Sequence, residues 1–203
     1  MDFKNRAKSW DNQSRSDRSK IIADKIIELV GKNRNSSVME YGCATGLIGF
    51  NICNAYKTLT LMDSEEEMIN IVKEKIEDYK IDNVSAIKVD LVKDDYSEEK
   101  FDIIYTSLTL HHILDIGLII QKFYNLLNEH GILCIIDLDT DDGSFHMDSK
   151  KFNGHNGFTH QEIEKILKNN GFFNIKSETF FHGTKQIRET DIPYSIFYSI
   201  GYK

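Results

Sequence analysis

The chain has 203 residues, of which 40% are hydrophobic and 28% are charged, and its formal net charge is -7. This length and composition are typical of one globular domain and exclude a fibrous or disordered chain. The negative charge opposes binding to nucleic acid or to an anionic membrane, and no stretch is apolar for long enough to span a bilayer.

Cysteine usage and the polar N-terminus indicate a reducing compartment. Residues 1–20 carry mixed charges and lack the apolar core of a secretory signal. The three cysteines, Cys43, Cys53 and Cys134, are odd in number and lack a paired metal-ligand spacing. We interpret Cys53 and Cys134 as small core residues, and we expect a cytoplasmic protein.

Hydrophobic periodicity predicts helices and strands in alternation. A first amphipathic helix runs through Ile21, Ile22, Ile26, Leu29 and Val30, and Gly31 is placed to end it. Seven β-type runs follow, at residues 37–41, 58–62, 84–89, 101–106, 133–137, 173–181 and 195–202. Helical segments lie between the first five runs, whereas only a polar stretch separates the last two.

Two of these helices begin with a capping-box pattern. Ser64 and Glu67 form the first pattern, and the inward residues of that helix are Met68, Ile71, Val72, Ile76 and Tyr79. The second helix begins at Thr159 with Glu162 as box partner, stops at Gly171, and buries Ile163, Ile166 and Leu167.

Repetition of strand and helix predicts an α/β fold, a Rossmann-like three-layer sandwich around a mostly parallel seven-stranded sheet. The last two strands should pair antiparallel, which gives an antiparallel C-terminal edge strand. With no linker, repeat or low-complexity tract, residues 1–203 should form one domain. The irregular stretch 137–157 should lie on the side where open α/β sheets bind ligands.

The strongest local pattern is an apolar strand that ends in an acid and enters a turn of small residues. Residues 38–46 read Val-Met-Glu-Tyr-Gly-Cys-Ala-Thr-Gly, and a helix opens at Leu47. Small residues allow a ligand to approach the backbone closely. A second strand ends at Asp63, about twenty residues after the turn, where an acid can accept both hydroxyls of a ribose. The pair of features indicates nucleoside binding.

With these residues the chain resembles the class I S-adenosylmethionine (AdoMet)-dependent methyltransferases over nearly its whole length. Glu40, Gly42 and Gly46 match the family's acid and glycine turn, and Ala44 stands where a middle glycine is usual. Residues 101–112 are similar to the fourth-strand segment of small-molecule members, and residues 127–133 to the turn into their fifth strand. Residues 7–11 look like the N-terminal cover of a bacterial subgroup without an assigned substrate.

The resemblance implies AdoMet as cofactor and a set of contacts to it. The turn from Gly42 to Gly46, with Cys43, Ala44 and Thr45, would pass beneath the methionine part, and Glu40 would also bind the cofactor. Asp63 would hold the ribose, and Ser64 and Met68 would also contact the cofactor. Asp90 and Leu91 would contact the adenine, Ser107 would complete the site, and residues 1–31 would form a helical cover.

Each of these residues also has a structural interpretation. Glu40 or Asp63 can cap a loop or helix, and Trp10 can pack on the domain. Arg15 and Arg18 can reach the cofactor's carboxylate or lie on a solvated helix face. Cys43 can fill the loop, although a thiol near a helix N-terminus can have a lowered pKa.

Methyl transfer from a sulfonium depends largely on in-line alignment, and a base is needed only when the acceptor must lose a proton. His111 and His146 are our candidate bases because histidine titrates near neutrality, with His155 and Tyr194 as alternatives. No metal site is predicted: adjacent histidines such as His111 and His112 would diverge on a helix or strand.

Two rival functions differ in class. An NAD-dependent oxidoreductase requires glycines where this chain has Ala44 and Leu47, so that spacing fails. A non-catalytic AdoMet-binding subunit that regulates or scaffolds a partner stays open, because fold does not guarantee activity.

The acceptor is the least specified part of the function. An Asn/Asp-Pro-Pro-aromatic turn after the fourth strand marks DNA amino methylation, and residues 107–110 contain no proline. We therefore expect a small-molecule acceptor. The sequence identifies neither the acceptor atom nor the oligomeric state.

Overall fold

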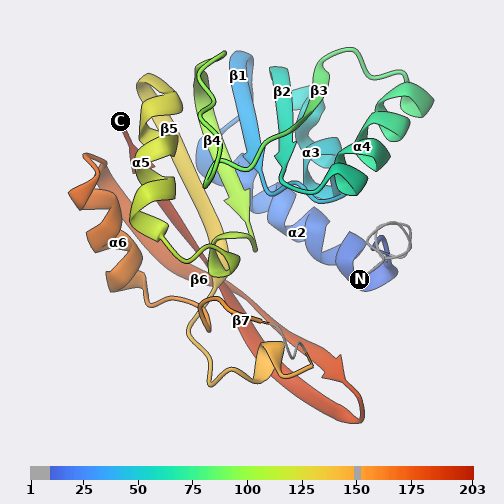
Figure 1. The fold of residues 1–203 in the computed structure, drawn as a ribbon, viewed down its shortest axis with the longest axis vertical. Coiled ribbons are helices and arrows are strands. Elements are labelled where there is room, and N and C mark those ends of the chain that lie inside the picture. Colours follow the sequence, from blue (N-terminus) through green and yellow to red (C-terminus); the bar gives the residue numbers. More distant parts are fainter. Residues whose placement is uncertain (1–9, 149–151) are drawn as a thin grey trace.

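The computed structural model describes residues 10–148 and 152–203. Its strands form one seven-stranded sheet in the order β3-β2-β1-β4-β5-β7-β6 (Figure 1). The strands are β1 Asn33–Tyr41, β2 Tyr56–Asp63, β3 Val84–Lys88, β4 Phe101–Ser107, β5 Leu127–Leu138, β6 Phe173–Ile187 and β7 Thr190–Tyr202. All seven predicted strands are present, and most of them extend further than the hydrophobic runs.

Strand direction confirms the predicted fold class. The strands from β1 to β5 pair in parallel, whereas β7 runs antiparallel to both β5 and β6. The final strand therefore lies one place in from the edge, and β6 is the edge strand. The predicted polar separator between the last two strands is mostly strand too, and its turn lies at Arg188 and Glu189.

Helices cover both faces of the sheet, which gives the predicted three layers (Figure 1). The helices are α2 Gln13–Val30, α3 Leu47–Ile52, α4 Glu66–Tyr79, α5 Ile116–Leu126 and α6 His160–Asn169, with the 3-10 turns η1 Cys53–Ala55, η2 Leu110–His112 and η3 Ser144–His146. Side chains of α2, α3 and α4 share one hydrophobic core, and those of α5 and α6 share the other.

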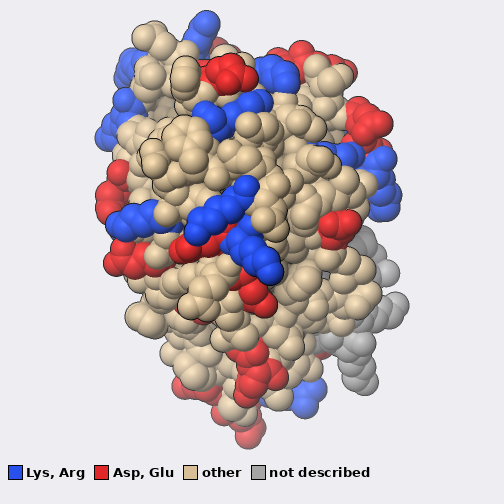
Figure 2. Space-filling model, turned by 90° about the vertical axis from the view of Figure 1, so that its left-hand side faces the viewer, with Lys and Arg blue, Asp and Glu red and all other residues tan. Residues whose placement is uncertain are grey.

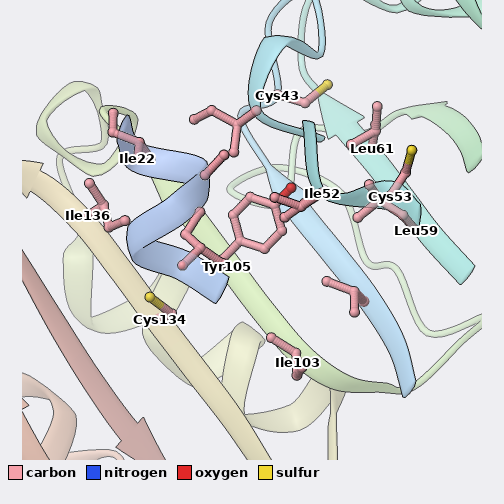
Figure 3. Close-up of a cluster of buried hydrophobic side chains, with 14 of the residues drawn as sticks. Ile22, Cys43, Ile52, Cys53, Leu59, Leu61, Ile103, Tyr105, Cys134 and Ile136 are labelled. Atoms are coloured by element: carbon pink, nitrogen blue, oxygen red, sulfur yellow. The ribbon is translucent and has the colours of Figure 1, made fainter. Parts of the chain in front are cut away.

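The two cores follow from the alternation of side chains along each strand. Val38 joins the core under α2 and α3, and its neighbour Met39 joins the core under α5. Tyr105 lies at the centre of the first core, with Cys134 and Cys53 among the side chains around it (Figure 3). All three cysteines are free and buried, so the core role predicted for Cys53 and Cys134 is confirmed.

Helix α2 belongs to this core along its second half. Ile22 and Ile26 are fully buried, and Gly31 ends the helix with a φ of 76° while its N–H donates to the Ile27 carbonyl. Ile21, an apolar residue of the same helix, is 45% exposed. Ile21 lies one position before the buried Ile22, so its side chain falls outside the buried face of α2.

The capping box predicted at Ser64 does not form. Helix α4 begins one residue later than predicted, with Glu65 at its N-cap and no side-chain capping bond. The Glu65 N–H itself donates to the strand-ending acid Asp63, at 2.9 Å. Tyr79, predicted to point inward, is 63% exposed. In α6 the predicted box of Thr159 and Glu162 is present in full.

The β6–β7 hairpin continues beyond the rest of the sheet. Pairing of β7 with β5 ends at Leu138 and Ile196, whereas its pairing with β6 continues to Ile187 and Thr190. Figure 1 shows this extension projecting past the end of the sheet, on the side of η3. The hairpin therefore forms a wall beside the loop that follows β5.

Candidate functional site

The carboxyl ends of the parallel strands meet at one edge of the sheet, which we call the carboxyl edge. Strand order reverses between β1 and β4, and in open α/β sheets ligands bind at this switch point. The loops after β1 and β4 touch there: a Cβ added to Gly42 would lie 2.1 Å from Thr109 Oγ1. Only glycine allows this approach.

The small-residue turn connects β1 to α3 through left-handed backbone. Gly42 and Gly46 both have a φ of 79°, and Ala44 has a φ of 46°. An alanine can adopt this conformation at a steric cost of roughly 1 kcal/mol, so the missing middle glycine leaves the turn intact. Thr45 and Cys43 in the same turn are buried.

Asp63 ties this turn to the next strand. Its Oδ2 accepts from the Ala44 N–H at 2.8 Å, and its Oδ1 accepts from the Glu65 N–H. Burial raises the pKa of Asp63, against the opposing effect of these backbone bonds. Of its predicted companions, Ser64 is exposed and Met68 is buried in α4. The acid therefore fixes the turn and stands at the end of β2, as the sequence placed it.

Glu40 points into the core instead of toward the carboxyl edge. Its side chain lies under α3, where Oε2 accepts from the Tyr105 hydroxyl at 2.9 Å, and a Cβ on Gly49 would come within 2.9 Å of it. Burial raises the pKa of Glu40 to about 8, although hydrogen bonds from Tyr105 and Gly49 oppose the rise. Its carboxyl group supports the turn from below.

The predicted adenine-side residues stand after β3. Asp90 accepts from the Val92 N–H and from Lys93 Nζ, and these bonds lower its pKa against the effect of desolvation. Leu91 is buried, and its N–H donates to the Tyr41 hydroxyl at 3.1 Å. In this structure Asp90 closes its own loop.

Ser107 ends β4 at the carboxyl edge and carries an unused polar group. Its hydroxyl is buried and has no hydrogen-bond partner among the described residues. A buried polar atom without a partner usually receives one from water or a ligand.

Asp11 and Lys75 join the site, although the sequence placed Asp11 only in the predicted cover and did not indicate Lys75. Asp11 accepts from the Thr45 hydroxyl and, at 2.7 Å, from Lys75 Nζ, which also donates to the Thr45 carbonyl. Beside it, the Arg15 guanidinium lies 4.3 Å from the centre of the Trp10 ring. These bonds attach the segment before α2 to the small-residue turn. The predicted cover, residues 1–31, falls partly outside the described residues, because those begin at Trp10.

The loops after β4 and β5 bring three histidines together. We call His111, His112 and His146 the histidine cluster. Its ring centres lie 4.1 to 5.7 Å apart, and each residue offers a ligand atom within 4.8 Å of the others. The prediction that His111 and His112 diverge was wrong. It assumed a helix or strand, whereas these residues form a 3-10 turn.

The members of the cluster differ in their surroundings. His111 is buried, and its Nδ1 lies 2.5 Å from Oδ1 of the fully buried Asp137, a partner that the sequence did not indicate. The pKa of His146 is lowered to about 4, mainly by desolvation and to a lesser extent by the two neighbouring histidines. The pKa of the more exposed His112 is also lowered to about 4, mainly by desolvation and to a lesser extent by His111. Both are neutral at physiological pH.

The alternative bases are already engaged. His155 Nε2 lies 3.0 Å from the Ile113 carbonyl, and the Tyr194 hydroxyl accepts from Arg18 Nη1 at 3.2 Å. Cys43 is no activated thiol: burial, with the charges of Glu40 and Asp63, raises its pKa well above the usual value. The hypothesis of a lowered thiol pKa was therefore wrong.

Two surface hollows have volumes of about 380 and 320 Å³. The first is lined by residues such as Asp24 and Arg34, and the second by Leu91 after β3 together with residues such as Tyr96 and Gln121. No helix among the described residues is long and apolar enough to cross a membrane.

Similar proteins share a common description. A family model described as a methyltransferase domain matches residues 32–192. An uncharacterized methyltransferase of Schizosaccharomyces pombe is 29% identical over 159 residues, which cover 71% of this chain and 56% of that protein. A malonyl-[acyl-carrier protein] O-methyltransferase of Ilyobacter polytropus is 29% identical over 134 residues, or 64% of this chain and 48% of that protein. The chain thus spans about half the length of these relatives.

Solved structures share the fold. A SAM-dependent methyltransferase from Aquifex aeolicus superimposes with a TM-score of 0.70 at 17% identity, covering 98% of this chain and 97% of that one. A protein from Bacillus halodurans, described as a methyltransferase, gives a TM-score of 0.71 at 12% identity, covering 89% and 97%. With the family match over most of its length and this shared fold, the chain belongs to the methyltransferase domain family.

Proposed function

We propose that the protein transfers a methyl group from AdoMet to a small-molecule acceptor at the carboxyl edge. The observation that carries this proposal is the small-residue turn at the switch point, fixed by Asp63 and pressed against Thr109. AdoMet, when bound, supplies a methyl group on a sulfonium whose departure leaves a neutral thioether. The residues fit it, since the turn admits a close ligand and Ser107 Oγ lacks a partner.

Each part of the site has a role in holding AdoMet. The turn from Gly42 to Gly46, including Cys43, Ala44 and Thr45, lies beneath the methionine part, and Glu40 supports it from the core. Asp63 receives the ribose hydroxyls. Ser64, Met68, Asp90, Leu91 and Ser107 complete the contacts.

The acceptor binds against the histidine cluster and loses its proton there. A bond forms between the acceptor atom and the methyl carbon, the carbon–sulfur bond breaks, and the proton passes to the cluster and then to water. His111 and His146 are the candidate bases. Because Asp137 engages Nδ1 of His111, the other ring nitrogen stays available.

The excess of acidic residues favours a small-molecule acceptor over a nucleic acid. The chain carries 32 acidic and 25 basic residues. On the face shown in Figure 2, basic and acidic side chains are interspersed and form no continuous basic surface. Phosphate backbones require such a surface. The free buried cysteines support a cytoplasmic location.

We treat residues 1–203 as one domain with a short cover. From Ser19 onward α2 is part of the core, so a cover that moves is proposed only for the residues before it. Trp10 and Asp11 are its described members that contact α2 and the turn.

The test is a labelling experiment with the full chain. Incubation with methyl-labelled AdoMet and a fractionated metabolite extract should give one labelled compound, identified by mass spectrometry. The His111→Ala variant should form it about 100-fold more slowly, with unchanged affinity for S-adenosylhomocysteine. His182→Ala, at an exposed histidine on β6, is the matched control. Cofactor binding without any labelled product would instead support a non-catalytic AdoMet-binding subunit.

A further inference from the structure

We propose that the histidine cluster binds a divalent transition-metal ion, with Zn²⁺ as its representative. The three residues come from two loops that follow neighbouring strands, η2 after β4 and η3 in the loop after β5. Their ligand atoms lie within 4.8 Å of one another. Three imidazoles suit zinc and its neighbours in the transition series, whereas magnesium and calcium require oxygen ligands.

The distances are close to those of a loaded site. Zinc–nitrogen bonds of about 2.0 to 2.1 Å place the nitrogens of a tetrahedral site roughly 3.4 Å apart. Closing the cluster therefore requires movements of roughly 1.5 Å or less, which side-chain rotation can supply. His112 is exposed and so has room to turn inward.

Asp137 supplies the partner that metal-binding histidines usually have. In such sites the second ring nitrogen donates to a carboxylate, which fixes the tautomer and the ring orientation. Asp137 is fully buried, and its Oδ1 lies 2.5 Å from His111 Nδ1. The arrangement leaves Nε2 of His111 as the nitrogen for an ion.

His146 provides an independent observation. Its Nδ1 is buried and has no hydrogen-bond partner among the described residues. The ring is stacked on Phe152, with centres 3.7 Å apart and planes 2° from parallel, so its orientation is fixed. Coordination through this nitrogen would satisfy a polar atom that otherwise carries a desolvation cost.

Binding of the ion goes beyond the proposed methyl transfer, because it requires neither AdoMet nor an acceptor. Three protein ligands leave a fourth position open, as in catalytic zinc sites. An acceptor hydroxyl, amine or thiol placed there would lose its proton more readily. In the loaded protein His111 is a metal ligand and no longer a base, and the ion would instead assist deprotonation by lowering the pKa of the bound acceptor.

The test is metal titration of the full chain without a polyhistidine tag. After treatment with EDTA and removal of the chelator, calorimetry with zinc chloride near pH 7 should show saturable one-to-one binding. Cobalt chloride should give the intense visible absorption of a tetrahedral site. His112→Ala and His146→Ala should each weaken zinc binding at least tenfold, and Asp137→Asn about 10- to 100-fold.

His182→Ala should bind zinc like the wild type. Circular dichroism checks that each variant is folded, and the exposed position of His112 makes His112→Ala the safest of them. An absence of saturable binding, or equal affinity in the folded cluster variants and the wild type, would overturn the proposal. S-adenosylhomocysteine titration of the EDTA-treated protein tests the cofactor site separately, so the two failures are distinguishable.

Discussion

The hydroxyl of Tyr105 in β4 donates to Oε2 of Glu40 in β1, at 2.9 Å and inside the hydrophobic core. Glu40, the next-to-last residue of β1, is thus a buried acid with Tyr105 as its side-chain partner. Its burial has a consequence for stability.

The free energy of unfolding should decrease as pH rises from about 4.5 to 8. The pKa of a glutamate side chain is ordinarily 4.5, whereas that of Glu40 is about 8 in the folded protein, so the folded state holds the extra proton in this window. The free energy of unfolding falls as pH rises wherever the folded state binds more protons than the unfolded state. For Glu40 the total decrease is at most about 5 kcal/mol. Glu40→Gln should flatten this slope.

The measurement is urea unfolding of both proteins at several pH values between 5 and 8.5. Asp63, whose pKa is also raised, adds a slope of the same sign, but it is present in both proteins and cancels in the difference. Identical slopes for Glu40→Gln and the wild type would show that Glu40 does not carry the extra proton.

Asp63→Ala should weaken AdoMet binding by about 1.5 to 3 kcal/mol, because hydrogen bonds to a charged group are worth about that much. Calorimetry with S-adenosylhomocysteine measures the loss, and NAD should show no comparable binding to the wild type. Asp82→Ala, at an exposed acid before β3, is the matched control. Unchanged affinity in a folded Asp63→Ala protein would remove this residue from the site.

Gly42→Ala should destabilise the fold by about 2 to 4 kcal/mol. Part of the cost is the positive φ of 79°, which strains an alanine. The other part is the overlap of the added Cβ with Thr109 Oγ1, which would lie 2.1 Å away. Replacing Thr109 by glycine in the same chain should recover the second part only. Thermal unfolding of the two single variants and the double variant gives the coupling free energy between positions 42 and 109. If the two changes in stability simply add, the loops after β1 and β4 do not touch.

Trp10 should report the closing of the cover. It is the only tryptophan, so titration with S-adenosylhomocysteine should shift or quench its emission, and cleavage by trypsin at Arg15 and Arg18 should slow. Arg6, a further cleavage point, lies outside the described residues. Asp11→Ala removes the acceptor of the Thr45 and Lys75 bonds and should weaken both responses.

Asp17→Ala, at an exposed acid of α2, is the control for that change. Saturable calorimetric binding with neither an emission change nor slower cleavage would leave Trp10 as an ordinary packing residue.

The parts of the site that the sequence predicted are those set by local patterns. The small residues from Gly42 to Gly46 and the acid Asp63 follow apolar strands directly, so their place at the strand ends could be inferred. The histidine cluster could not be, because His146 reaches His111 through a long loop whose course depends on tertiary contacts. The Lys185 side chain, for example, donates to the Phe145 carbonyl from the distant hairpin.

Two local errors have separate causes. Ser64 has the sequence of a cap, yet α4 begins at Glu66 with Glu65 as its N-cap, so Ser64 lies one position too early to cap it. The contact of Asp11 with the turn was missed because its partners, Thr45 and Lys75, are distant in the chain and no periodicity links them.

The position of β7 between β5 and β6 affects synthesis of the chain. Strand β5 is translated long before β7, which pairs with its outer edge. Strand β6 is translated before β7 but lies on the far side of β7, so it cannot pair with β5. Until residues 190–202 leave the ribosome, the hydrogen-bonding edge of β5 has no partner. Such open edges promote aggregation, so nascent chains that stall before this strand should depend on chaperones more than the finished protein does.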